Sequence, residues 1–370
     1  MKNYIILTRF SVIMKSTLSA WRISSNSDIK DVVNRVFEEK RLRSRTNIFT
    51  RHSLPIIDVA SKTRNIKHIV VTSTLLPDWC KKELDESSNK YDWLDIVYVD
   101  PDTGYNLNRE ISKAADKLSK KLAQENIIIA SLRLDDDDLL SSNYFETIDQ
   151  YQKSEFVDYC ISTPRGYRGL YDGDKYLCFS YENIPNNAYG MAIITSYSLK
   201  NSSFTSQYLF PPGTHIDMDK RIPVILDGRK HTFLRTMGRD NDGFSLGSSY
   251  AYEDELSQIR KKHFPNPISE TEEVESLFGV TGEKISIFEY LSELVTFKNN
   301  NIIISYNKNK EIDIEMAFYL IDLNGNKIIT TNYSDELHFS FPAKYHGTHQ
   351  VIAFCKKGDE REKRVVKIES

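Results

Sequence analysis

The sequence predicts an α/β protein, with a mainly parallel, Rossmann-like sheet followed by a small antiparallel β-sandwich. From residue 1 to about 160, short apolar runs alternate with longer amphipathic stretches, as in βαβ units. From about 285 to the end, strand-like runs follow one another across turns such as Asn324-Gly325-Asn326. We expect a sheet domain at 1–265, a linker at 266–284 and an immunoglobulin- or fibronectin-like sandwich at 285–370.

The expected strands of the first part are short apolar runs bounded by polar residues. They are Tyr4–Leu7, His68–Thr72, Asp95–Val99, Ile127–Leu132 and Phe156–Ser162. Amphipathic spacing predicts helices between them at Asp28–Lys40, Pro77–Glu86 and Arg109–Gln124. Between about 160 and 265 the strands become shorter and turns more frequent, which indicates a subdomain grafted on the sheet. Further strands are expected in the sandwich near residues 301, 312, 327, 337, 349 and 364.

The composition excludes several classes of protein. With Lys+Arg 49 against Asp+Glu 52 among 370 residues, no positive excess marks a nucleic-acid binder. No apolar run approaches the roughly 20 residues of a spanning helix, so we expect at most peripheral membrane association. The 4 Cys are scattered without a zinc or disulfide pattern. We therefore expect a cytoplasmic protein, at the inner face of the membrane if it associates with one.

The most informative segment is 127–140, in which four aspartates follow a buried strand. Residues 127–130 are apolar without alternation, as expected of a central parallel strand covered on both faces. Ligands of open α/β sheets bind beyond the carboxyl ends of the strands. This acidic run is therefore expected at the functional edge, and it consists of Asp135, Asp136, Asp137 and Asp138.

Four adjacent carboxylates repel one another unless a cation or hydrogen-bond donors offset their charge. Mn²⁺ or Mg²⁺ is the simplest offset, because hard cations accept carboxylate oxygens together with those of a diphosphate. The alternative is a solvated acidic turn that caps a helix expected at Ser141–Gln150. Because the run directly follows a buried strand and Arg133, we favour a metal site with Asp135, Asp137 and Asp138 as ligands.

A basic segment, residues 40–55, could complete the site. Arg is the side chain best matched to phosphate geometry. On a helix, Arg41 and Arg45 share a face while Arg43 points elsewhere, so at least one of the three is expected to be a solvated surface charge. Arg9, at the end of the first strand, lies on the same edge of the sheet as the acids and is a further candidate.

Four short blocks occur in a recognisable order: Ile6-Leu7-Thr8-Arg9-Phe10, then Leu42-Arg43-Ser44-Arg45 with Phe49 and Leu54-Pro55, then Arg133-Leu134-Asp135-Asp136-Asp137-Asp138, then Pro164-Arg165-Gly166-Tyr167. Together they resemble the bacterial rhamnosyltransferase family, whose members look like GT-A glycosyltransferases. The resemblance covers about residues 1–250, and the family name implies a dTDP-rhamnose donor. Because sugar identity rarely transfers between distant relatives, the expected donor is a dTDP-, UDP- or GDP-linked sugar. The donor-binding residues that the resemblance implies are Thr8, Arg9, Arg43, Arg45, Arg133, Asp135 and Asp136.

The chain departs from the family blocks at three positions. Thr46 stands where a Phe is expected, and Leu139 follows the acids where Ala is common. In the block 231–241, Met237 stands where the family has a His. If that His contacts metal or phosphate in relatives, its role here is lost or has moved to His231 or His215, and we take His231 as the fourth candidate ligand.

An inverting glycosyltransferase also needs a carboxylate near the acceptor hydroxyl. The loop-like segment 211–223 supplies Asp217, which is the predicted base. Asp219, Asp240 and Glu182 are the alternatives, and no base is required if the enzyme retains configuration.

These features predict a metal-dependent glycosyltransferase that moves a sugar from a nucleotide sugar to a bacterial surface polysaccharide or related glycan. Two alternatives stay open. A nucleotidyltransferase also uses a sheet-edge acid pair and a metal, but it would ordinarily carry a Gly-rich phosphate loop after the first strand, and residues 7–16 contain no Gly. A non-catalytic carbohydrate-binding protein would suit the sandwich but not the acidic run.

Overall fold

The computed structural model describes residues 1–13, 29–102, 106–211, 215–239, 252–264, 267–268, 271–282, 288, 291–308, 313–347, 349–357 and 360–366. The chain divides into two units, Met1–Glu283 and Lys284–Ser370. Each unit is built around its own sheets, and each is described here by itself.

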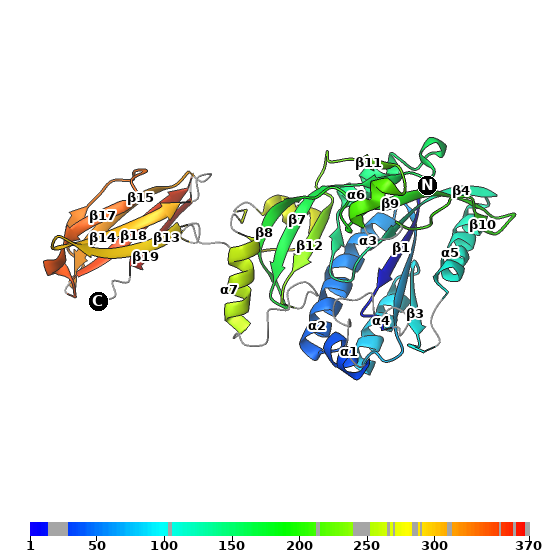
Figure 1. Cartoon of the computed structure of the whole chain (residues 1–370), viewed down its shortest axis with the longest axis horizontal. Coiled ribbons are helices and arrows are strands. Elements are labelled where there is room, and N and C mark those ends of the chain that lie inside the picture. Colours follow the sequence, from blue (N-terminus) through cyan, green and yellow to red (C-terminus); the bar gives the residue numbers. More distant parts are fainter. Residues whose placement is uncertain are drawn as a thin grey trace. The chain divides into compact units, whose positions relative to one another are not determined.

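The first unit is built on an eight-stranded sheet (Figure 1). Its order is β11-β6-β9-β4-β1-β2-β3, with β10 beside β9. Strands β4, β1, β2 and β3 are parallel neighbours, whereas β9 runs antiparallel to both β4 and β6. The strands are β1 (Asn3–Arg9), β2 (Asn65–Ser73), β3 (Leu94–Val99), β4 (Asn126–Arg133), β6 (Cys160–Ser162), β9 (Ala192–Ser198), β10 (Ser203–Phe204) and β11 (Val224–Leu226).

Helices cover both faces of this sheet, which gives three layers (Figure 1). On one face, α5 (Leu107–Leu122) packs Ile111, Ala115 and Leu118 against Ile5 and Ile129 of the sheet. The other face carries α2 (Glu39–Asn47), the π-helical turn η2 (Ile48–Ser53), α3 (Leu54–Ser61), α4 (Asp78–Lys90) and α6 (Ser142–Asp149). The central strands are buried on both sides, as their unbroken apolar sequences predict.

A second sheet stands beside the first, in the order β5-β12-β7-β8. Its strands are β5 (Leu139–Leu140), β7 (Arg165–Tyr171), β8 (Tyr176–Asn183) and β12 (Phe233–Met237). An added Cβ at Gly166 would lie 2.4 Å from the Phe233 carbonyl oxygen, so a glycine is needed for this close approach of β7 and β12. Because β5 follows the acidic run directly, this sheet forms one side of the region around the acids.

The second unit is a sandwich of two antiparallel sheets. One contains β13 (Leu291–Lys298), β14 (Asn301–Lys308) and β17 (His338–Pro342), and the other contains β16 (Lys327–Thr330), β15 (Glu315–Asp322), β18 (His349–Lys357) and β19 (Glu360–Val366). The buried rings of Phe318 and Phe339 stack at a centroid distance of 5.3 Å between the sheets. The chain thus has a mainly parallel sheet domain followed by a unit of antiparallel sheets, so the predicted fold class is confirmed.

The structure differs from the prediction in local detail. The helix expected at Asp28–Lys40 is two helices, α1 (Ile29–Val36) and α2, because the Glu38 carboxylate caps α2 by accepting a 2.8 Å hydrogen bond from Arg41 N. The last strand expected in the first part begins only at Cys160, after the 3₁₀ turn η3 (Ser154–Phe156). Strands β7 and β13 were not among the expected elements.

The stretch predicted as a linker, 266–284, contains a helix instead. Helix α8 (Glu272–Phe278) buries Val274 and Phe278 in a cluster with Tyr167 and Phe179 of the second sheet. The spacing of Val274 and Phe278 puts both on one face of the helix, so this acidic segment has an apolar stripe that packs. It is preceded by α7 (Tyr252–His263).

Candidate active site at the carboxyl edge of the parallel sheet

The acidic run leaves the sheet between β1 and the second sheet. Leu134 N donates a 3.0 Å hydrogen bond to Leu7 O, which extends the pairing of β4 with β1 just beyond Arg133. The chain then turns through the four aspartates and enters β5, which pairs with β12. This places the run at the carboxyl end of a central strand, where α/β sheets bind ligands.

The Arg45 guanidinium neutralises the two middle aspartates. Its Nη1 contacts Asp136 Oδ1, and its Nη2 lies 3.0 Å from Asp137 Oδ2. Asp136 Oδ2 also accepts a 3.1 Å hydrogen bond from Ser11 N. Arg45, Asp136 and Asp137 are all buried. A buried arginine therefore supplies for these two carboxylates the positive charge that the sequence analysis assigned to a metal.

Asp138 has a different partner. Its Oδ1 accepts a 3.1 Å hydrogen bond from Thr236 N on β12, which ties the end of the run to the second sheet. Burial and the neighbouring Asp137 carboxylate raise the pKa of Asp138 well above its usual range. Its role in this structure is therefore to join two sheets, and its side chain is not open to a ligand.

Asp135 is the one exposed aspartate of the run. Enough protein surrounds its carboxyl that desolvation raises its pKa, although Arg9 and Arg133 oppose the shift. The Asp135 side chain is thus reached by solvent while protein atoms surround much of its carboxyl group. Within the described residues, neither the Asp135 carboxylate nor the Arg133 guanidinium has a hydrogen-bond or ion-pair partner, so both are available to a ligand.

Positive side chains gather around Asp135. Burial and the nearby Arg9 lower the pKa of Arg133, so the two guanidinium groups lie close enough to repel each other. Burial and Arg133 also lower the pKa of His215. Two like charges held beside one carboxylate suit a ligand with several negative oxygens, such as a diphosphate.

The second sheet brings further charged and aromatic side chains near the acidic run. Arg235 on β12 lies over the Tyr189 ring at 5.2 Å, and its Nη1 is 3.3 Å from Glu182 Oε1 on β8. The pKa of Tyr189 is raised by burial and by the charges of Asp138, Glu182 and Asp135. Tyr189 is therefore close to both the acidic run and the Glu182–Arg235 pair, and these groups face one region.

The sequence model of the family described as "Putative rhamnosyl transferase" matches residues 3–247 of the 370. The chain belongs to this family. Membership identifies it as a glycosyltransferase, and the matched residues include the acidic run, Arg9, Arg133 and both members of the Glu182–Arg235 pair. No curated protein matches the chain. None of its described helices has the length and apolar character needed to cross a membrane.

Thr8, which the family resemblance implied as a donor contact, is fully buried. Its hydroxyl donates a 2.8 Å hydrogen bond to Leu134 O, so His68 Nε2, 2.8 Å away on β2, must donate to the hydroxyl oxygen. Burial lowers the pKa of His68 to about 3, which keeps the ring neutral. Thr8 thus fixes the point where the acidic run leaves the sheet and does not face a ligand.

The three arginines of α2 separate as the helical period predicts. Arg41 and Arg45 are buried on one face, and Arg41 Nη1 donates a 2.8 Å hydrogen bond to Val36 O. Arg43 is exposed, pairs with Glu39 at 2.8 Å and lies over the Trp79 ring at 4.4 Å. Arg43, implied as a donor contact, is therefore the surface charge of the three.

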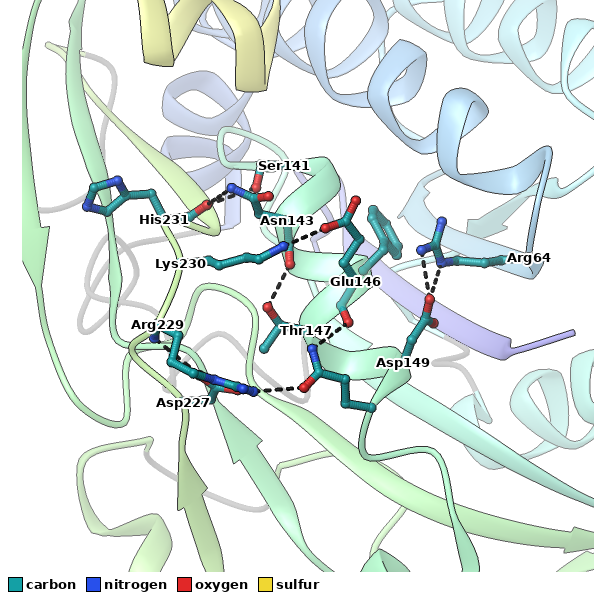
Figure 2. Close-up of polar contacts among 12 residues, drawn as sticks. Arg64, Ser141, Asn143, Glu146, Thr147, Asp149, Asp227, Arg229, Lys230 and His231 are labelled. Carbon is teal, nitrogen blue, oxygen red and sulfur yellow. Dashed lines mark hydrogen bonds and ion pairs between the residues drawn. The ribbon is translucent and has the colours of Figure 1, made fainter.

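The structure does not bring His231 to the acidic run. Figure 2 shows its ring directed away from α6, while its backbone carbonyl accepts hydrogen bonds from Ser141 Oγ at 3.1 Å and Asn143 Nδ2 at 3.3 Å. Its Nδ1 lies 3.0 Å from both Tyr167 Oη and Glu273 Oε1. Asp138 meets β12 at Thr236, five residues after His231. An extended chain of that length spans roughly 15 Å, so His231 lies far from Asp138.

The predicted base, Asp217, lies in the 3₁₀ segment η4 (His215–Lys220). It forms a 2.9 Å ion pair with Lys220, and this partner lowers the pKa of its largely exposed carboxyl. Asp219 is exposed on the same segment, and Asp240 lies outside the described residues. The third alternative, Glu182, is buried and faces Arg235, whose charge also acts on Asp138.

Of the predicted metal ligands, only Asp135 remains in a position to bind an ion. No group of three or more His, Cys, Asp or Glu side chains could hold one in the part of the chain that the structure describes. The predicted ligands are divided, since Asp137 faces Arg45, Asp138 faces Thr236 N and His231 lies elsewhere. Proteins often hold Mg²⁺ through one or two carboxylates and the phosphates of the substrate. Asp135 fits a cation that arrives with a diphosphate.

A separate cavity of about 410 Å³ lies at the opposite, amino edge of the parallel sheet. Its lining includes Arg64, Lys67, Trp93 and Lys117. None of the predicted site residues is among its lining residues, and the carboxyl edge is where the acids and their arginines meet. We therefore assign the active site by its charges rather than by cavity size.

Sequence reasoning missed Arg235, although its place next to buried Leu234 and Thr236 on a strand was a usable signal.

Proposed function

We propose that this glycosyltransferase moves a sugar from a nucleoside diphosphate donor to a glycan acceptor at the carboxyl edge of the parallel sheet, around Asp135. The observation that carries the proposal concerns Asp135 and Arg133, at the carboxyl end of β4. Among the residues that the structure describes, neither side chain has a hydrogen-bond or ion-pair partner. With Arg9 nearby, they offer a diphosphate two guanidinium groups and one carboxylate. The family description favours a rhamnosyl donor, and a dTDP-linked rhamnose is the first candidate.

A Mn²⁺ or Mg²⁺ ion held by Asp135 and the donor's phosphates is part of the proposal. When bound, such an ion neutralises charge that develops on the departing nucleoside diphosphate. The chain's own residues hold the phosphates through Arg9 and Arg133 and keep Asp135 in place through the Arg45 clamp on Asp136 and Asp137. Arg45 neutralises Asp136 and Asp137 without a metal, so the fold does not require a resident ion. This is consistent with an ion that enters together with the substrate.

We further propose Glu182 as the base that takes the proton of the attacking hydroxyl. Its Oε2 has no hydrogen-bond partner in the described part of the chain, and burial raises the pKa of its carboxyl despite the Arg235 charge. A carboxylate whose pKa lies closer to neutral is the better base. Asp217 is the weaker alternative, because Lys220 lowers the pKa of its exposed carboxyl.

Donor turnover by the purified full chain tests the function. We expect release of nucleoside diphosphate from one class among dTDP-, UDP- and GDP-sugars, and a rise in the melting temperature with that donor, since a ligand bound only by the native state stabilises it. The release should require added Mn²⁺ or Mg²⁺ and stop with EDTA.

Each result separates one part of the proposal from another. Turnover that survives EDTA would remove the cation and leave glycosyl transfer intact. Release of pyrophosphate from a nucleoside triphosphate and a sugar phosphate would instead identify a nucleotidyltransferase. If no donor is turned over and none raises the melting temperature, glycosyl transfer at this site is wrong.

The base is tested by comparing Glu182→Gln with Asp217→Asn. We expect Glu182→Gln to lower kcat for donor hydrolysis by roughly 10²-fold or more, the usual contribution of a general base, with little change in the KM for the donor. The amide keeps the shape of the side chain and its contact with Arg235. Asp217→Asn should change kcat by less than about threefold, and the reverse order of effects would restore Asp217 as the base.

A further inference from the structure

The sandwich unit has a groove of about 540 Å³ on the outer face of its four-stranded sheet. Three aromatic side chains line it. They are Tyr319 of β15, Phe354 of β18, and Tyr333, which lies between β16 and β17. Its volume is within the range of small-molecule and oligomer binding sites. It belongs to a unit that the family match, residues 3–247, does not reach.

Strand alternation explains why these rings face outward. Phe318 and Leu320 of β15 are buried in the sandwich core, so Tyr319 between them points to the opposite face, where it is half-buried. Phe354 pairs across the strands with Ala317. The small Ala317 side chain leaves a hollow on the sheet where a larger residue would fill the space.

The aromatic floor is open to solvent. The Tyr319 and Phe354 rings are in contact, with centroids 4.6 Å apart and planes inclined at 52°. The exposed Lys327 places its ammonium 4.4 Å from the centroid of the Tyr319 ring. The Lys327 side chain can lie over the Tyr319 ring only because that ring face is accessible. A ligand can therefore displace the lysine from the ring.

The rest of the groove is polar. Thr331 and Asn332 offer hydroxyl and amide groups, and Arg361 and Lys363 of β19 add positive charge against the single carboxylate of Glu362. The Arg361 guanidinium lies 6.0 Å from the centroid of the Tyr333 ring. The lining thus combines flat apolar rings with hydrogen-bonding groups and a net positive rim.

We propose that this groove binds a glycan chain. A pyranose ring has an apolar face of C–H groups, which matches an aromatic floor, and hydroxyl edges that match the surrounding polar side chains. The positive rim favours chains that carry carboxylates. Identification of this glycan as the acceptor rests on the proposed function, whereas binding itself does not.

The test is electrophoresis of the full chain through gels that contain dextran, mannan or polygalacturonate. We expect retardation by at least one polysaccharide, and most by polygalacturonate. Tyr319→Ala and Asn332→Ala should each raise the dissociation constant about tenfold or more. Asn332 is exposed, so its variant tests binding without removing packed atoms. Phe297→Ala is the matched control, because Phe297 is an exposed aromatic on β13 outside the groove, and it should bind like the wild type.

The failure of this proposal can be told apart from failure of the proposed function. Retardation of a wild-type protein that neither turns over a donor nor is stabilised by one would support the groove and refute the transferase site. Donor turnover without retardation by any of the three polysaccharides would overturn the groove alone. Equal retardation of wild type and both groove variants would also overturn it, as would concentration-dependent self-association that Tyr319→Ala abolishes in the absence of polysaccharide.

Discussion

Arg45→Met is expected to destabilise the first unit by about 3–5 kcal/mol, the usual cost of leaving buried charges without their partner. The Arg45 guanidinium contacts Asp136 and lies 3.0 Å from Asp137, and all three side chains are nearly inaccessible to solvent. Methionine keeps most of the aliphatic volume but no charge. The two carboxylates would then have to take up protons or admit water. Urea denaturation at neutral pH measures the loss.

Arg43→Met is the matched control on the same helix. Arg43 is 53% exposed in its side chain and pairs with Glu39, so its replacement should cost no more than about 1 kcal/mol. The double variant Arg45→Met with Asp136→Asn should recover part of the loss, because it removes one of the stranded charges. Equal destabilisation by Arg45→Met and Arg43→Met would show that the buried clamp contributes little.

The helical period alone separates the buried arginines of α2 from the exposed one. Residues four apart on a helix share a face, so the sequence placed Arg41 and Arg45 together and Arg43 apart. It could not reveal that Arg45 reaches Asp136, 91 positions further along the chain. Periodicity identifies the face that is buried, whereas the partner on the other side depends on how the sheet is assembled.

The same limit applies to the acidic run. A buried apolar strand followed by acids correctly predicts that the acidic run lies at the carboxyl edge of the sheet. Asp135 and Asp137 are two positions apart, so their side chains would point the same way only if the stretch were extended. The run turns, since Asp138 N donates to Asp135 O at 3.3 Å. A turn gives each carboxylate its own direction, and Asp135 alone remains exposed.

Residues on the second sheet were harder to foresee. Strand β7 contains Gly166 and Gly169, which weaken a strand signal, and Gly166 is there because β12 approaches closely. His231 had the chemistry of a metal ligand but packs beside Tyr167 at a ring distance of 4.8 Å. Helix α8 supplies Glu273 to this histidine, and its acidic sequence had suggested a linker. In each case a tertiary contact decided between two local interpretations.

Asp135→Asn is expected to lower kcat/KM for the donor by about 10²-fold or more, with the free energy of unfolding unchanged or slightly higher. The estimate corresponds to about 3 kcal/mol of lost transition-state stabilisation. The carboxylate has no partner among the described residues, and burial already raises its pKa, so the native structure loses no contact when the charge is removed. Steady-state kinetics and thermal unfolding of the same protein give both quantities.

Asp136→Asn is the matched comparison one residue further along. Asp136 is buried against Arg45 and accepts a hydrogen bond from Ser11 N, so its amide variant should lose stability first and activity only as a consequence. Arg133→Gln should also lower kcat/KM for the donor, because Arg133 lies close to Asp135. The assignment would be overturned if Asp135→Asn retained more than half of the wild-type activity while Asp136→Asn lost activity without losing stability. The donor site would then lie at the buried Arg45–Asp136 pair and not at Asp135.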